Sequence, residues 1–144
     1  MSVGEILKAK GADVQTIEGD ATVADAVERL RDERIGALVV SPDGETIDGV
    51  LSERDIIVGL ANHRADLLRM KVRDLMTTSV TTCSPEDGVE KVMLEMTELR
   101  ARHFPVVDDG RLVGIVSIGD VVKNRLDEVQ LEKAVLRDTY IAGR

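Results

Sequence analysis

The chain has 144 residues and a formal net charge of −8, with 43% apolar and 32% charged residues. This composition is that of an ordinary globular protein with an aliphatic core, because Phe104 and Tyr140 are its only aromatic residues. The negative charge excludes a basic face for phosphate-backbone binding, and the lack of aromatic side chains argues against stacking on single-stranded nucleic acid. We therefore expect no nucleic-acid partner.

The cysteine, histidine and hydropathy patterns exclude several further classes of protein. Cys83 is the only cysteine, so no internal disulfide can form and a reducing compartment is expected. Two distant histidines, His63 and His103, and one cysteine do not make a zinc signature. The first residues lack the order of a signal peptide, and no apolar run is long enough to span a bilayer. These observations predict a cytoplasmic protein with no membrane segment and no metal.

The first half of the chain is expected to form an alternating set of helices and strands. Thr22, followed three residues later by Asp25, is typical of a capping box, and residues 41–44 (Ser-Pro-Asp-Gly) are a strong turn signal. The expected elements are a helix over residues 3–10, a strand over 14–17, a helix from about 22, strands over 35–40 and 47–51, and a helix from 53 to about 61.

The second half repeats this order, because the chain contains an internal duplication. Residues 49–57 (GVLSERDII) recur 65 residues later as residues 114–122 (GIVSIGDVV). We expect helices over 72–76 and about 88–100, strands over 80–83, 104–107 and 112–116, and a final helix from Asp120. A unit this small buries too little surface alone, so two copies, residues 1–67 and 68–144, are expected to form one compact module. Function is then expected in the crevice between them.

The final helix is longer than the repeat requires, and it carries an apolar stripe. The stripe is interrupted by Lys133 and consists of Val122, Leu126, Val129, Leu136 and Tyr140. An apolar seam of this spacing predicts a partner helix, and hence a homodimer. The alternative is that the helix packs back on its own domain.

Each copy of the duplication contains a Ser-x-x-Asp motif after an apolar strand, Ser52 to Asp55 and Ser117 to Asp120. Where a strand turns directly into a helix, unpaired N–H groups and the helix dipole favour an anion. Arg54 adds a forked cationic donor suited to phosphate, and a carboxylate can accept from ribose hydroxyls. The motif therefore suits a ribose-phosphate. The alternative is that both aspartates are only helix caps.

These motifs, together with residues 35–40 (IGALVV) and 102–107 (RHFPVV), resemble the paired motifs of the CBS domain family, named after cystathionine β-synthase. The resemblance covers about residues 3–140. It implies an α/β (α+β) fold of two β-α-β-β-α repeats related by a pseudo-twofold axis, and two clefts that bind adenosine-containing ligands. The pair would stand alone, with no fused catalytic domain.

The resemblance also implies the residues of the two clefts. In the second cleft, Ser117 and Gly119 would contact the phosphate and Asp120 the ribose, with Ile115, His103, Thr16, Ile35, Gly36 and Ala37 lining the site. In the first cleft, the corresponding residues are Ser52, Arg54 and Asp55, with Thr82 near the ribose and Val50, Arg102, His103 and Phe104 around the base. For His103, a simple structural role is the alternative.

The expected function is a non-catalytic regulatory module that senses adenine nucleotides and changes its conformation or its affinity for a regulated protein. AMP, ADP, ATP, NAD(H) and S-adenosylmethionine remain open as ligands. The alternative is an interaction scaffold with vestigial clefts that acts through its C-terminal helix. An enzyme is not expected, because no nucleophile–base pair, GxSxG motif or Walker-type motif is visible. Cys83 is expected to be a small buried apolar residue.

Overall fold

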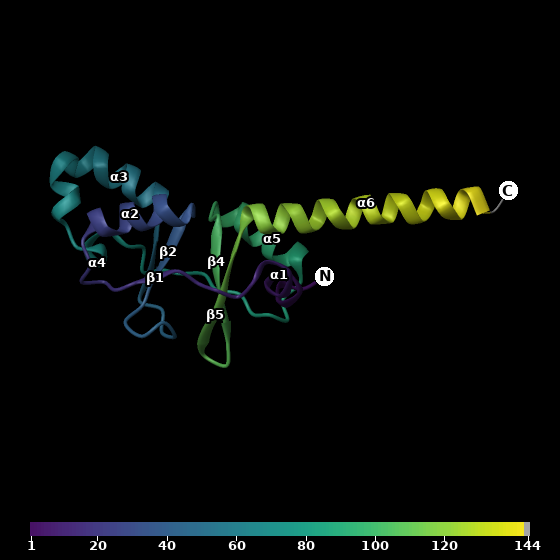
Figure 1. Cartoon of the computed structure of the whole chain (residues 1–144), viewed down its shortest axis with the longest axis horizontal. Helices are drawn as coiled ribbons and strands as arrows, with labels where there is room; N and C mark the ends of the chain where they lie inside the picture. Colours follow the sequence, from purple (N-terminus) through teal and green to yellow (C-terminus); the bar gives the residue numbers. More distant parts are fainter. Residues whose placement is uncertain (143–144) are drawn as a thin grey trace.

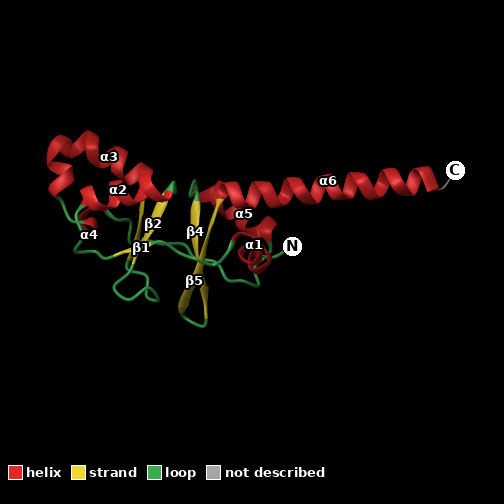
Figure 2. Cartoon of the chain, in the orientation of Figure 1, coloured by secondary structure: helices red, strands yellow, loops and turns green. Residues whose placement is uncertain are grey.

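The computed structural model describes residues 1–142, which form a mixed α/β fold of two halves and a projecting C-terminal helix (Figures 1 and 2). The first half contains α1 (Val3–Lys10), β1 (Thr16–Ile17), α2 (Val23–Glu33), β2 (Ala37–Val40), β3 (Gly49–Ser52) and α3 (Glu53–His63), followed by the 3-10 helix η1 (Arg64–Arg69). The second half contains α4 (Val72–Leu75), α5 (Val89–Leu99), β4 (His103–Asp108), β5 (Arg111–Ser117) and α6 (Ile118–Ala142).

Each half has a small sheet built around a hairpin. β1 runs parallel to β2, which pairs antiparallel with β3, and β4 pairs antiparallel with β5. The strand expected over residues 80–83 is wrong in extent, because only Cys83 forms a bridge, to Val106. The N–H of Val80 donates to the carbonyl of Thr78 at 3.0 Å, so the chain turns locally instead of extending along β4.

The segment that opens each repeat pairs with the other half. The N–H of Val3 donates to the carbonyl of Asp87 and the N–H of Val72 to that of Ala21, at 2.9 and 2.8 Å. The isolated bridges Ser2–Gly88 and Thr22–Lys71 show the same reciprocal arrangement. α1, which opens the first repeat in the sequence, therefore packs in space on the second half, and α4, which opens the second repeat, packs on the first half. The two halves are joined by these crossing segments as well as by η1.

The crossing segments contribute to both apolar cores. The core of the second half is centred on fully buried Phe104 and also contains Val3, Ile6, Leu7, Cys83, Val89, Val92, Met96, Val106, Val116 and Val121. The core of the first half contains Ile17, Ala26, Leu30, Leu38, Val40, Leu51 and Val72. Each fully buried aliphatic side chain stabilises the fold by about 1.5–3 kcal/mol relative to exposure. The core of each half therefore includes side chains from the lead segment of the other repeat.

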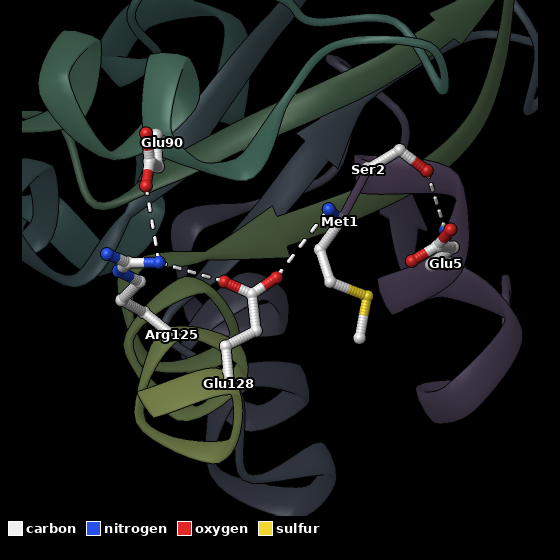
Figure 3. Close-up of polar contacts among 6 residues, drawn as sticks. All are labelled: Met1, Ser2, Glu5, Glu90, Arg125 and Glu128. Atoms are coloured by element: carbon white, nitrogen blue, oxygen red, sulfur yellow. Dashed lines mark hydrogen bonds and ion pairs between the residues drawn. The ribbon is translucent and has the colours of Figure 1, made fainter. Parts of the chain in front are cut away.

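The first turns of α6 are fastened to the second half by a group of charged residues (Figure 3). The carboxylate of Glu128 lies 3.6 Å from the Met1 amino group and 3.1 Å from the Arg125 guanidinium, which also lies 3.2 Å from Glu90 of α5. Beyond these contacts, every residue from 130 to 140 is exposed, and α6 projects away from the rest of the chain (Figure 1). Packing back on its own domain therefore accounts for the start of this helix only.

Among residues 1–142, no helix combines the length and the apolar character needed to cross a membrane.

Candidate functional site

The two Ser-x-x-Asp motifs form matching junctions between a strand and a helix. At the start of α3, the Ser52 N–H donates to Asp55 Oδ2 at 2.9 Å, and the Asp55 N–H donates to Ser52 Oγ at 3.3 Å. At the start of α6, the Ser117 N–H donates to Asp120 Oδ2 at 2.9 Å, and the Asp120 N–H donates to Ser117 Oγ at 3.1 Å. Both aspartates therefore cap their helices through one carboxylate oxygen, which leaves the second oxygen, Oδ1, for another role.

A cavity of about 560 Å³ lies at the first of these junctions, between the two halves. The start of α3 lines it from the first half, and residues 77, 79–81 and 99–104 line it from the second half. Seven of the eight residues predicted for the first cleft line this cavity, namely Val50, Ser52, Arg54, Asp55, Arg102, His103 and Phe104. The eighth, Thr82, does not line it, whereas the neighbouring Thr81 does.

The charges around the cavity favour an anionic ligand. Three basic residues, Arg54, Arg100 and Arg102, line the cavity together with two acidic residues, Glu53 and Asp55. Sequence reasoning had not named Arg100 as a site residue. It ends α5 in the left-handed conformation, with φ 54°, which turns the chain from the helix towards β4 along the cavity wall. The equivalent Arg34 ends α2 in the same way, with φ 55°. An arginine that ends this helix in both repeats is the sequence feature that could have identified Arg100.

Thr77 is a second residue that the sequence did not single out. Its hydroxyl donates to Asp55 Oδ1 at 3.1 Å, and it also lines the cavity. It follows α4, whose helix packs on the first half, so the crossing segment places it beside Asp55. The backbone of Thr77 is fixed by reciprocal hydrogen bonds with Val50, at 3.0 and 2.9 Å.

The second junction is arranged differently, because a lysine occupies it. Lys10 Nζ donates to Asp120 Oδ2 at 2.6 Å and to the carbonyl of Ile115 at 3.0 Å. Burial raises the pKa of Asp120, but the hydrogen bonds from Lys10 and Ser117 outweigh it, and the pKa lies below its ordinary value. Asp120 is therefore held as a carboxylate with a cation against it.

The structure does not bring the other residues predicted for the second cleft together at one place. Gly36 and His103 line the cavity at the first junction, and Ala37 is the buried first residue of β2. The carbonyl of Thr16 accepts from Arg29 at 3.0 Å. Ile35 is half-buried against the core of the first half, and Ser117 and Gly119 lie at the start of α6 beside Asp120. Gly36 and His103 thus lie where the two sites meet.

His103 is largely removed from solvent at this meeting point. A Cβ added to Gly36 would lie 3.0 Å from His103 Cε1, so the imidazole packs directly on the glycine backbone. Burial lowers the pKa of His103, while Glu53 and Asp120 act to raise it and Lys10 and Arg102 to lower it. The net result is a pKa below the ordinary value, which favours the neutral imidazole.

Cys83 has the role of a small buried apolar residue, as predicted. It is 5% exposed within the core of the second half, and burial raises its pKa to about 12. A thiol in this state is neither a nucleophile nor a metal ligand at neutral pH. Among the described residues, no group of three His, Cys, Asp or Glu side chains could hold a metal ion.

Comparison with known proteins assigns the family. The family model for the CBS domain matches residues 3–62 and 72–127, which are the two repeats. The chain belongs to the CBS domain family. Its two repeats follow the duplication that the sequence contains, and the family assignment that the sequence motifs predicted is confirmed.

Three relatives illustrate the match. The mitochondrial CBS domain-containing protein CBSX3 of Arabidopsis thaliana is 36% identical over 153 residues, covering 99% of this chain and 72% of the relative. The crystal structure of a CBS-domain protein of Agrobacterium tumefaciens is 38% identical with a TM-score of 0.84, covering 87% of this chain and 99% of that one. The CBS domain pair of protein MJ0100, solved with 5-methylthioadenosine and S-adenosyl-L-methionine, is 26% identical with a TM-score of 0.75, covering 85% and 98%.

Proposed function

We propose that this CBS pair is a non-catalytic regulatory module that binds adenine nucleotides in the clefts between its repeats. The observation that carries the proposal is the cavity of about 560 Å³ at the Ser52–Asp55 junction. Its volume lies within the range of about 300–1,000 Å³ typical of small-molecule sites. Its walls combine a helix start, a carboxylate and three arginines, which are the groups that a ribose-phosphate needs.

Each part of the nucleotide has a counterpart in the first cleft. The phosphates would meet Arg54, the Ser52 hydroxyl and the first N–H groups of α3, and the ribose would meet the Asp55 carboxylate. The adenine would lie against the aliphatic side chain of Val50 and the segment from Arg102 to Phe104. The second cleft would use Ser117, Gly119 and Asp120 in the same roles. The MJ0100 complex supports the ligand class, because both of its ligands contain adenosine.

The regulatory part of the proposal follows from the position of the cavity. Residues of both halves line it, so a bound ligand contacts both and favours one arrangement of them over another. The size of that effect equals the difference in ligand affinity between the arrangements. The crossing of α1 and α4 between the halves would carry the change to both cores. The regulated protein would recognise the ligand-dependent arrangement.

Calorimetric titration with AMP, ADP, ATP, NAD and S-adenosylmethionine tests the proposal. At least one of these ligands should bind, with a dissociation constant between micromolar and millimolar, which corresponds to about −8 to −4 kcal/mol. Mass spectrometry of small molecules that co-purify with the native protein would identify the natural ligand. If none of the five binds at millimolar concentration and no adenosine compound co-purifies, the proposal is wrong.

The exposed end of α6 favours a second candidate, an interaction scaffold acting through that helix. Leu131, Val135 and Leu136 are 66, 55 and 70% exposed on a segment in which every residue from 130 to 140 is exposed. An isolated helix end of this length is marginal in water, so a second copy of the chain is the partner that we propose for it. The two candidates differ in one result: adenine nucleotides raise the melting temperature of a sensor and leave that of a scaffold with vestigial clefts unchanged.

A further inference from the structure

The ammonium group of Lys10 contacts two oxygen atoms at the second junction, one of them the carboxylate oxygen that also caps α6. It lies 2.6 Å from Asp120 Oδ2 and 3.0 Å from the Ile115 carbonyl oxygen. The side chains of Lys10 and Asp120 are only 33 and 25% exposed, so the pair is partly shielded from water. Lys10 is the last residue of α1, whose Val3, Ile6 and Leu7 are fixed in the core of the second half. The lysine is therefore held at this site by the fold of its own chain.

The first junction differs, because its crossing segment brings a hydroxyl to the aspartate. There the crossing segment contributes Thr77, whose neutral hydroxyl contacts Asp55 Oδ1 at 3.1 Å. The second cleft receives Lys10 from the equivalent segment of the other repeat, and the cation contacts Oδ2 of Asp120. A hydroxyl can rotate to share the carboxylate with a ribose, whereas an ammonium in a charge-assisted hydrogen bond blocks any ligand group that needs Asp120 Oδ2 or the Ile115 carbonyl. The two clefts therefore differ in how readily a ligand can enter them.

We propose that Lys10 is an internal competitor for the second cleft, which occupies the Asp120 carboxylate and the Ile115 carbonyl until a ligand displaces it. This inference rests on the proposed function and adds an order of binding. A nucleoside enters the first cleft without breaking an ion pair, and enters the second only at the cost of the Lys10–Asp120 contact. The first cleft fills at lower ligand concentration than the second.

Displacement of Lys10 also has a structural consequence. Gly11 follows directly, with φ +96°, and begins the segment that leads from the second half to β1 in the first. When the ammonium leaves Asp120, the end of α1 loses its polar contacts with β5 and the start of α6, while Leu7 stays packed in the core of the second half. Occupancy of the second cleft would then loosen the start of the segment that leads to the first half.

The test compares the wild-type protein with Lys10→Met and with Lys8→Met, an exposed lysine two residues earlier on the same helix. Methionine keeps an unbranched side chain and removes the charge. Adenosine is the probe, because a neutral ligand gains nothing from the lysine charge itself. Amide signals of Ser117 and Gly119 in ¹⁵N-labelled protein report the second cleft, and those of Ser52 and Arg54 report the first.

Lys10→Met should tighten adenosine binding at the second cleft by about 1.5- to 5-fold, as expected for loss of one partly exposed ion pair. Binding at the first cleft, and at both clefts in Lys8→Met, should stay at the wild-type value. If adenosine binds the second cleft of Lys10→Met as weakly as in the wild type, or more weakly, the competitor role is wrong and the proposed function stands. If neither adenosine nor ATP moves any of the four signals in any variant, both are wrong.

Discussion

The imidazole of His103, at the start of β4, lies against the backbone of Gly36, the residue before β2. A Cβ built on Gly36 would lie 3.0 Å from Cε1 and 3.2 Å from Nε2 of His103, and 3.4 Å from a carboxylate oxygen of Glu53. Gly36 belongs to the first repeat and His103 to the second, and both line the cavity. The two halves of the module thus meet here, where only glycine leaves room for the histidine.

Gly36→Ala should destabilise the protein by about 1–3 kcal/mol, because the added methyl group forces His103 or Glu53 to move. Thermal or urea unfolding monitored by circular dichroism measures the change. Gly119→Ala is the control, since a Cβ at Gly119 meets only Ser117 Oγ, at an ordinary 3.6 Å, and the residue lies within α6. If both variants unfold at the same denaturant concentration, the close contact between the halves does not exist in solution.

The protein should lose stability as the pH falls below about 6.5, and His103 should account for part of the loss. Its pKa in the folded state is lowered from 6.5, so between the two values the unfolded state binds more protons. The contribution of His103 to the free energy of unfolding is complete above pH 6.5 and is lost as the pH falls through the folded-state pKa of His103. Asp120, whose pKa is also lowered, adds a loss of the same sign below about pH 3.8.

The measurement is the free energy of unfolding from about pH 7.5 to pH 5. His103→Gln should flatten this dependence, because glutamine does not titrate. His63→Gln, at the exposed end of α3, should keep the wild-type slope. An unchanged slope in His103→Gln would show that His103 takes up its proton as readily in the folded protein as in the unfolded chain.

Arg54→Ala should weaken nucleotide binding at the first cleft by about 1.5–3 kcal/mol, the range for hydrogen bonds to charged groups. The second cleft should be nearly unaffected, since Arg54 lies on α3 and that cleft is built from β5 and α6. The affinity of Arg54→Lys at the first cleft should lie between those of the wild type and Arg54→Ala, because lysine keeps the charge but loses the forked donor geometry. Calorimetry that finds wild-type affinity at both sites in Arg54→Ala would remove this residue from phosphate binding.

Dimerisation through the end of α6 predicts that Leu131→Glu/Leu136→Glu is a monomer, whereas the wild type sediments as a dimer at micromolar concentration. Both leucines are exposed in the single chain, so the substitutions should leave its fold intact. Lys133→Glu changes the net charge by the same −2 on the same stretch and should leave the dimer intact. A monomeric wild type would contradict the prediction.

A chain truncated after Gln130 is an independent test of dimerisation through the end of α6. A shorter chain ending at Asn124 also loses Arg125 and Glu128, which contact Glu90 and the Met1 amino group. Its effect on the dimer could not be separated from damage to the monomer. The chain that ends at Gln130 keeps these contacts and removes only the exposed part of the helix.

The repeats, the helices and the hairpins could be predicted because each has a local signal. The Thr22 cap and the turn at residues 41–44, where Gly44 has a positive φ, each depend on a few neighbouring residues, and the duplication is visible as a repeated sequence. The short strand expected before Cys83 was the main error. Its residues are β-branched, but the local turn at Thr78 to Val80 competes with pairing along β4.

The crossing of the lead segments could not be predicted in the same way. Nothing in the first ten residues indicates that Val3 pairs with Asp87 rather than with its own repeat. The partners of the two aspartates, Thr77 and Lys10, depend on that crossing and were missed with it. The two Ser-x-x-Asp motifs predict similar clefts. The clefts differ because segments far apart in the sequence place Thr77 beside Asp55 and Lys10 beside Asp120.

The central claim is that Asp55 and Asp120 bind nucleotide in addition to capping their helices. Asparagine caps a helix about as well as aspartate, but it lacks the charge and one acceptor oxygen. The unliganded Asp55→Asn/Asp120→Asn protein should therefore melt close to the wild type, with a small loss of about 0.2–1 kcal/mol from the Lys10 ion pair. Saturating ATP should raise the melting temperature of the wild type and leave that of the double variant unchanged. A double variant that shows the full wild-type shift with ATP would contradict the account.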